Sequence, residues 1–109
     1  MSMKISKEAY EKLIKEDFVT LETAYLLKEK GMYIDIRFPT KYIAQKWLRE
    51  TKNLHVEISY MYGNFWIYDI LRIPNHDMVG LSDRPLTHYS TYEEALEAGI
   101  QEALKLVEE

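Results

Sequence analysis

The feature that most limits the fold is the stretch 54–73, LHVEISYMYGNFWIYDILRI. Two runs rich in β-branched and aromatic residues flank Gly63-Asn64, a dipeptide typical of turns. This pattern predicts an antiparallel β-hairpin. Because two strands alone are only marginally stable in water, the flanking segments must supply a further strand and covering helices.

The length of the hairpin loop decides which side chains face the core, since a slip of one residue moves every side chain to the opposite face. A two-residue loop would pair Ile58 with Asp69 and place a carboxylate among apolar groups. A three-residue loop over 62–64 avoids this, and Asn64 suits its left-handed position. The expected core face then carries Val56, Ile58, Tyr60, Trp66, Tyr68 and Ile70. The opposite, mostly polar face carries His55, Glu57, Ser59, Ile67 and Asp69, as in a sheet covered on one side.

Helical periodicity and capping residues predict helices over 7–16, 21–30, 41–51 and 92–107, opened by Ser6, Thr20, Thr40 and Ser90 or Thr91. Their expected apolar faces are Tyr10, Leu13, Ile14 and Phe18; Leu21, Ala24 and Tyr25; Ile43, Ala44, Trp47 and Leu48; and Tyr92, Leu96, Gly99 or Ile100, Ala103 and Val107. Gly99 inside a helix costs about 1 kcal/mol relative to Ala, so a close approach to the sheet is expected there.

The third strand is predicted at 86–89, after a loop over 74–84, and residues 32–38 form either a short edge strand or an extended connection. The predicted fold is therefore α+β, in the order α-α-α-β-β-β-α, with a three-stranded antiparallel sheet and helices packed on one face. We expect one domain over 1–109, with a helical N-terminal part (1–39) and an α-β-β-β-α part (40–109).

The amino-acid composition and net charge exclude several classes of function and site. The chain of 109 residues is 47% hydrophobic and 29% charged, as in soluble globular proteins. It has no cysteine, which excludes disulfides, thiolate metal sites and cysteine nucleophiles. No apolar run approaches membrane-spanning length and the N-terminus lacks an apolar signal core, so we expect a cytoplasmic protein without a membrane partner. The net charge of −4 makes nucleic acid an unlikely partner.

Catalytic motifs are absent from the sequence. There is no nucleophile elbow, P-loop, GxGxxG or paired metal-binding histidine, so no catalytic residue, metal site or cofactor is predicted. Glu57 and Asp69 would face each other across the hairpin, most simply as an exposed pair. Whether the chain is an enzyme stays open, with a non-enzyme favoured. The alternative is a small enzyme whose site lies near His76 and Asp77 in the 74–84 loop.

Two surfaces are candidates for binding. Met61, Tyr62 and Phe65 lie at the hairpin tip, where exposed aromatic residues and methionine would suit a protein interface or self-association. A small non-enzymatic accessory protein that binds another protein is the leading hypothesis. The alternative is nucleic-acid binding through a basic patch on the third helix, composed of Lys41, Lys46, Arg49 and Lys52; such charges more often form a solvated face.

The order α-β-β-β-α over 40–107 resembles the double-stranded RNA-binding domain. That family carries a lysine-rich cluster at the start of its last helix, where it grips phosphates. The matching stretch here is STYEEALE (90–97), whose three carboxylates would repel phosphates and favour the helix dipole instead. The resemblance therefore implies a similar element order without the RNA-binding chemistry.

A second resemblance covers about half the chain. The stretches TLETAYLLKEKG (20–31), AQKWLRE (44–50), LHVEI (54–58) and TYEEALEAGIQEALKLVEE (91–109) are similar to a set of short uncharacterised proteins of gut-bacterial phages and mobile elements. This resemblance implies a cytoplasmic bacterial or phage context. It carries no activity or site residue over to this chain.

Overall fold

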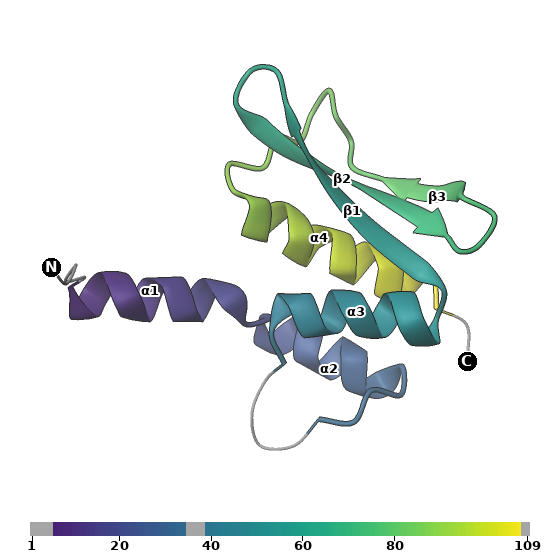
Figure 1. The fold of residues 1–109 in the computed structure, drawn as a ribbon, viewed down its shortest axis with the longest axis horizontal. Helices are drawn as coiled ribbons and strands as arrows, with labels where there is room; N and C mark the ends of the chain where they lie inside the picture. Colours follow the sequence, from purple (N-terminus) through teal and green to yellow (C-terminus); the bar gives the residue numbers. More distant parts are fainter. Residues whose placement is uncertain (1–5, 35–38, 108–109) are drawn as a thin grey trace, which may run out of the picture.

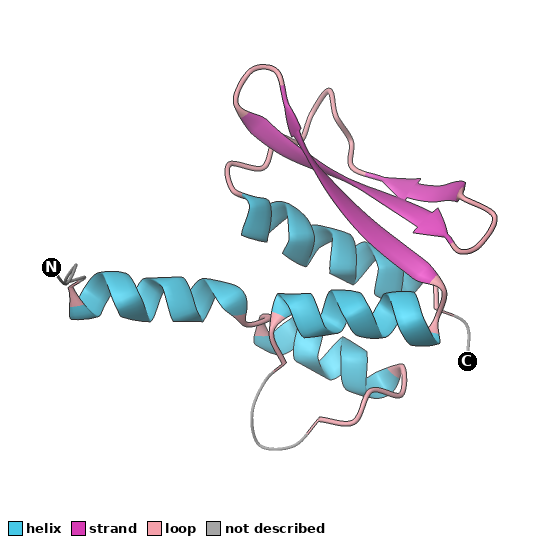
Figure 2. Cartoon of the chain, viewed as in Figure 1, coloured by secondary structure: helices cyan, strands magenta, loops and turns pink. Residues whose placement is uncertain are grey.

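The computed structural model describes residues 6–34 and 39–107, apart from the side chains of Tyr10, Leu13 and Ile14. The elements, in chain order, are α1 (Lys7–Asp17), α2 (Leu21–Glu29), α3 (Lys41–Thr51), β1 (Leu54–Met61), β2 (Phe65–Arg72), β3 (Asp77–Leu81) and α4 (Tyr92–Lys105). The protein is α+β, and the predicted element order is confirmed (Figures 1 and 2). The expected apolar face of the first helix and the connection at 35–38 lie outside the described residues.

The three strands form an antiparallel sheet in the order β1-β2-β3. Met61 lies opposite Phe65 and Ile58 lies opposite Tyr68, so the predicted three-residue loop and register are confirmed. Asn64 has a φ of +66° and is followed directly by β2, as the loop requires.

The third strand lies at 77–81, and its predicted position at 86–89 is wrong. The later segment contributes one isolated bridge, between Tyr89 and Trp66. The true strand, DMVGL, is short, and a register shift interrupts its pairing with β2 between Ile70 and Leu71. The segment resembles a loop in sequence because it begins with a polar residue and contains a glycine. Its irregular pairing with β2 also removes the regular alternation expected of a strand.

The N-caps were predicted well. Side-chain oxygens accept hydrogen bonds from backbone N–H groups three residues on, in the pairs Ser6–Ala9, Thr20–Thr23, Thr40–Ile43 and Thr91–Glu94. Of the two alternatives for α4, Thr91 is the cap. Ser90 instead donates its hydroxyl to the Glu94 carboxylate at 3.0 Å. At the other end of α2, Gly31 has a φ of +109°, which suits a helix stop.

The core lies between the sheet and the helices α3 and α4, which contact one face of the sheet, while α2 packs on α4 (Figure 1). In the same view α1 extends away from these elements. A Gln45 amide nitrogen donates to the Val56 carbonyl at 2.6 Å and so fixes α3 beside β1. Gly99 brings α4 against the sheet, because a Cβ atom there would lie only 2.5 Å from Val56 Cγ1.

Two predicted helix faces need correction. In α2, Leu21 and Tyr25 are 52% and 64% exposed, and the buried residues are Thr23, Ala24 and Leu27. The helix is rotated because Thr23 turns inward to the Glu97 carboxylate of α4. In α3, Ala44 and Leu48 are buried and Trp47 is half-buried, but Ile43 is exposed.

Candidate functional site

The first candidate surface is the hairpin tip, composed of Met61, Tyr62 and Phe65, and it carries a fully exposed aromatic side chain. Tyr62 is 103% exposed, whereas Met61 and Phe65 are half-buried. The structure therefore brings the three residues together at one end of the sheet but presents only Tyr62 fully to solvent. A shallow hollow of about 530 Å³ lies at the tip, lined by residues 60–64.

Hydrogen bonds and aromatic contacts brace this tip. The Tyr60 hydroxyl donates to Asn64 Oδ1 at 2.7 Å, and the Tyr60 ring lies 4.8 Å from that of Trp66. Trp66 in turn meets Tyr92 of α4 edge to face at 5.4 Å. Tyr60 was expected on the core face, but its side chain is largely exposed beside the tip.

Phe65 is held on the opposite face of the sheet by His88. The two rings stack at a centroid distance of 3.8 Å and an interplanar angle of 12°. His88 belongs to the connection 82–91 between β3 and α4, so this connection supports the hairpin from the side that faces away from the helices. Phe65 is therefore a brace for the tip more than a free contact residue.

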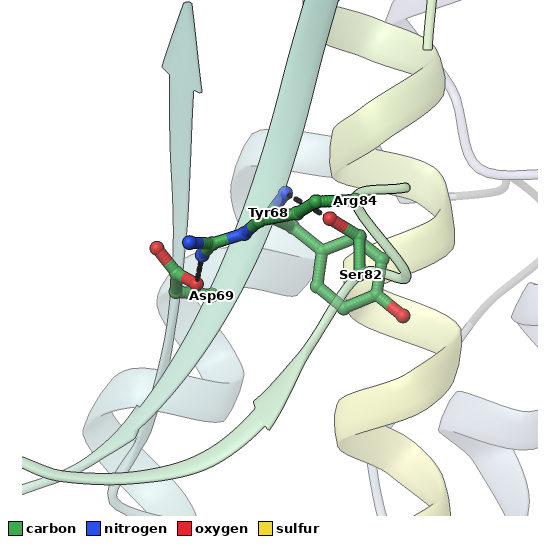
Figure 3. A network of polar contacts seen from close by, with 4 residues as sticks. All are labelled: Tyr68, Asp69, Ser82 and Arg84. Atoms are coloured by element: carbon green, nitrogen blue, oxygen red, sulfur yellow. Dashed lines mark hydrogen bonds and ion pairs between the residues drawn. The ribbon is translucent and has the colours of Figure 1, made fainter. Parts of the chain in front are cut away.

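Two side chains of the same connection, those of Ser82 and Arg84, make polar contacts with β2 (Figure 3). Arg84 forms an ion pair with Asp69, and the buried Ser82 hydroxyl accepts from the Tyr68 backbone N–H at 3.3 Å. Ile67, which was expected on a mostly polar face, is only 2% exposed. The expected exposed pair of Glu57 and Asp69 is opposite in register, but Asp69 has Arg84 as its charge partner.

The predicted basic residues do not form one uniform solvated face. Lys41 is buried, and its ammonium donates to the Glu16 carbonyl oxygen. Lys46 forms an i,i+4 ion pair with Glu50 at 3.8 Å, and the Lys52 ammonium lies 5.5 Å from the centroid of the Trp47 ring.

Arg49, the fourth predicted basic residue, lines a different hollow near the base of the hairpin, together with His55, Glu57 and His76. Asp77 is not part of that lining, because it begins β3 while His76 ends the preceding turn. Of the predicted pair of His76 and Asp77, His76 therefore lines this hollow and Asp77 does not. This grouping could not be predicted from the sequence, since it depends on the position of β3. The one signal in the sequence was the alternation that places His55 and Glu57 on one face of the strand.

Tyr68, on the core face, provides a pH-dependent test of the packing. Burial raises the pKa of its phenol to about 12, with smaller contributions from Glu102 and Tyr89. The unfolded chain has an ordinary tyrosine pKa of about 10. Between these two pH values the unfolded state releases the phenol proton and the folded state keeps it. The contribution of Tyr68 to the free energy of unfolding is therefore complete below pH of about 10 and is lost as the pH rises to about 12.

The variant Tyr68→Phe removes this titration and is expected to flatten the fall in unfolding free energy measured by urea denaturation between pH of about 9 and 11.5. Part of the slope should remain, because burial also raises the pKa of Tyr89. Equal slopes in both proteins would show that the Tyr68 phenol does not control alkaline unfolding.

Within residues 6–34 and 39–107, no cluster of three or more histidine, aspartate or glutamate side chains is arranged to hold a metal ion. No helix in the same ranges has both the length and the apolar character needed to cross a bilayer. Comparisons with protein-family models, with curated proteins and with solved structures found no match to this chain.

Proposed function

We propose that the protein is a small accessory protein, without catalytic activity, that binds another protein through the tip of the β1–β2 hairpin. The observation that carries this proposal is the complete exposure of the Tyr62 side chain at the end of a braced hairpin. Tyrosine is enriched at protein interfaces because it supplies a large apolar ring and a hydroxyl that can hydrogen-bond.

The bracing of the tip supports this function energetically. The contacts from Tyr60 to Asn64 and from Phe65 to His88 hold the loop in one arrangement before any partner arrives. A loop that is already ordered loses less conformational entropy on binding than a flexible one. Tyr62 can therefore act as a preorganised anchor, with the hollow at 60–64 receiving a side chain of the partner.

The resemblance to proteins of gut-bacterial phages and mobile elements extends the proposal to a context. The partner is proposed to be a protein of the bacterial or phage cytoplasm.

The test is an affinity pull-down of the tagged full chain from a gut-bacterial lysate, with and without nuclease. A protein partner should survive nuclease treatment, and Tyr62→Ala should weaken its binding at least tenfold, or about 1.4 kcal/mol, since an exposed aromatic anchor is lost. The matched control is Tyr33→Ala, because Tyr33 is also a highly exposed tyrosine, at 87%, but lies far from the tip in sequence and belongs to another segment.

Loss of the partner on nuclease treatment would contradict the proposal and redirect attention to the basic residues of α3. Equal binding by the Tyr62 and Tyr33 variants would also contradict it, because the tip would then contribute no specific contact.

A further inference from the structure

Aromatic side chains continue from the hairpin tip to the starts of α4 and α3, and we call this set the aromatic row. Its members are Tyr62, Tyr60, Trp66, Tyr92 and Tyr42. In Figure 1 the hairpin tip, the start of α4 and the start of α3 follow one side of the molecule. The binding surface at the tip therefore continues along a row of rings from three separate elements.

Contacts between neighbours hold the rings of the aromatic row at an angle to one another. Tyr62 and Tyr60 line the tip hollow together, and the Tyr60 ring is tilted by 55° against that of Trp66. Trp66 and Tyr92 meet at 83°. Tyr60 and Tyr42 are 56% and 43% exposed, and Trp66 and Tyr92 are half-buried. The row therefore presents fixed ridges with notches between them, and not one flat platform.

Carboxylates lie at the α3 end of the aromatic row. The Tyr42 hydroxyl donates to the Glu93 carboxylate, and Asp17 lies near the same phenol. Burial raises the pKa of this phenol, and the negative charges of Glu93 and Asp17 raise it further. The Lys41 ammonium donates to the Glu16 carbonyl oxygen and forms no ion pair with either carboxylate within the described ranges. This end of the row therefore attracts a positive charge and repels phosphate.

A proline-rich chain has the shape that such a row requires. In the polyproline II conformation it repeats every three residues, and its carbonyl groups make no internal hydrogen bonds. Proline rings can pack into the notches between tilted aromatic rings, and the fully exposed Tyr62 hydroxyl can donate to a carbonyl of the chain. The conformation is stiff before binding, so little entropy is lost when it meets a braced surface.

We propose that the aromatic row binds a proline-rich segment of the partner protein, with a basic residue of that segment beside Glu93 and Asp17. This inference rests on the proposed function, because it names the chemistry of the partner that the hairpin tip binds. The prolines pack along Tyr62, Tyr60 and Trp66, and the basic side chain lies at the α3 end.

The test is an NMR titration of the ¹⁵N-labelled full chain with synthetic probes: an oligoproline with an arginine at each end, the same oligoproline without charges, and a glycine-serine peptide of equal length with the same arginines. A short oligothymidine tests the aromatic row for nucleic acid. The arginine-ended oligoproline should produce saturable shifts centred on residues 42, 60–66 and 92–93. Its dissociation constant should be at least tenfold lower than those of the glycine-serine peptide and the oligothymidine.

Two pairs of variants test the two halves of the proposal. Tyr60→Ala should weaken binding of both oligoprolines at least tenfold, whereas Tyr25→Ala, which removes a similarly exposed ring from α2, should leave binding unchanged. Glu93→Gln should weaken binding of the arginine-ended oligoproline about threefold and that of the uncharged one not at all. Glu57→Gln is the charge-matched control, because Glu57 is an exposed carboxylate on the opposite face of the sheet. Signal dispersion verifies that each variant folds.

The proposal would be overturned by equal binding of the proline and glycine-serine peptides, by tighter binding of the oligothymidine, or by no saturable shift with either oligoproline. An equal effect of the Glu93 and Glu57 variants would overturn the assignment of the basic residue. If Tyr62→Ala still released the partner in the pull-down, these results would refute the proline-rich chemistry and leave binding through the tip intact.

Discussion

Replacing Gly99 by alanine is expected to destabilise the protein by about 2 kcal/mol, even though alanine is the better helix former, because overpacking a filled core typically costs more than helix propensity returns. The added Cβ atom would lie 2.5 Å from Val56 Cγ1 and 3.2 Å from Tyr68 Cβ. Neither atom is the mobile end of a long side chain, so α4 or the sheet must move. Urea unfolding at neutral pH measures the loss.

Two further variants separate sterics from helix propensity. Ala98→Gly, on the neighbouring half-buried position of α4, should destabilise by about 1 kcal/mol through helix propensity, with a further loss from its partly buried methyl group, and it introduces no clash. In a Val56→Ala background, Gly99→Ala should cost about 1 kcal/mol less than in the natural chain, because the closest clashing atom is gone. A stabilising effect of Gly99→Ala in the natural chain would disprove the close approach between helix and sheet.

Removing the Glu97 carboxylate is expected to destabilise the protein by about 2 kcal/mol, since hydrogen bonds to a charged group contribute roughly 1.5–3 kcal/mol. Glu97 accepts from the Thr20 backbone N–H at 3.3 Å, from the Thr20 hydroxyl at 3.0 Å and from the buried Thr23 hydroxyl. These bonds join the start of α2 to α4. Glu97→Ala should therefore increase amide hydrogen exchange in α2 more than in the sheet.

Glu97→Gln retains one acceptor oxygen and should lose less stability than Glu97→Ala. Glu102→Ala is the matched control, because Glu102 is a half-buried carboxylate on the same helix with no hydrogen bond to α2 among the described residues. If the Glu97 and Glu102 variants exchanged α2 amides at equal rates, the carboxylate would not be what holds this helix.

The register of the hairpin could be predicted because one face is buried, so only one loop length kept Asp69 away from the apolar side chains. The helix caps could also be predicted from the sequence, since each depends on a contact between residues only three positions apart. The rotation of α2 could not be predicted, because the inward turn of Thr23 depends on Glu97, which lies 74 residues later in the sequence.

The prediction of where β3 lies was wrong for a related reason. Its residues pair with β2 through an irregular register, and Gly80 lies tightly against Ile70, so the segment lacks the alternating apolar pattern of a free-standing strand. This error in the position of β3 also affected the prediction of the candidate sites. Tyr62 could be selected from the loop alone, whereas the hollow lined by Arg49, His55, Glu57 and His76 needs the turn before β3 to bring His76 to the hairpin.

The bonds between α2 and α4 also determine when the protein can finish folding during its synthesis. Chains emerge from the ribosome N-terminus first, so α2 appears long before Glu97 and before Val107, whose carbonyl accepts from Lys30. A helix of 9 residues is barely stable alone in water. The strands of the sheet are neighbours in the sequence, so they can pair with one another before α2 has its partner α4. Helix α2 therefore cannot take its final place until α4 has been made, although α2 leaves the ribosome much earlier.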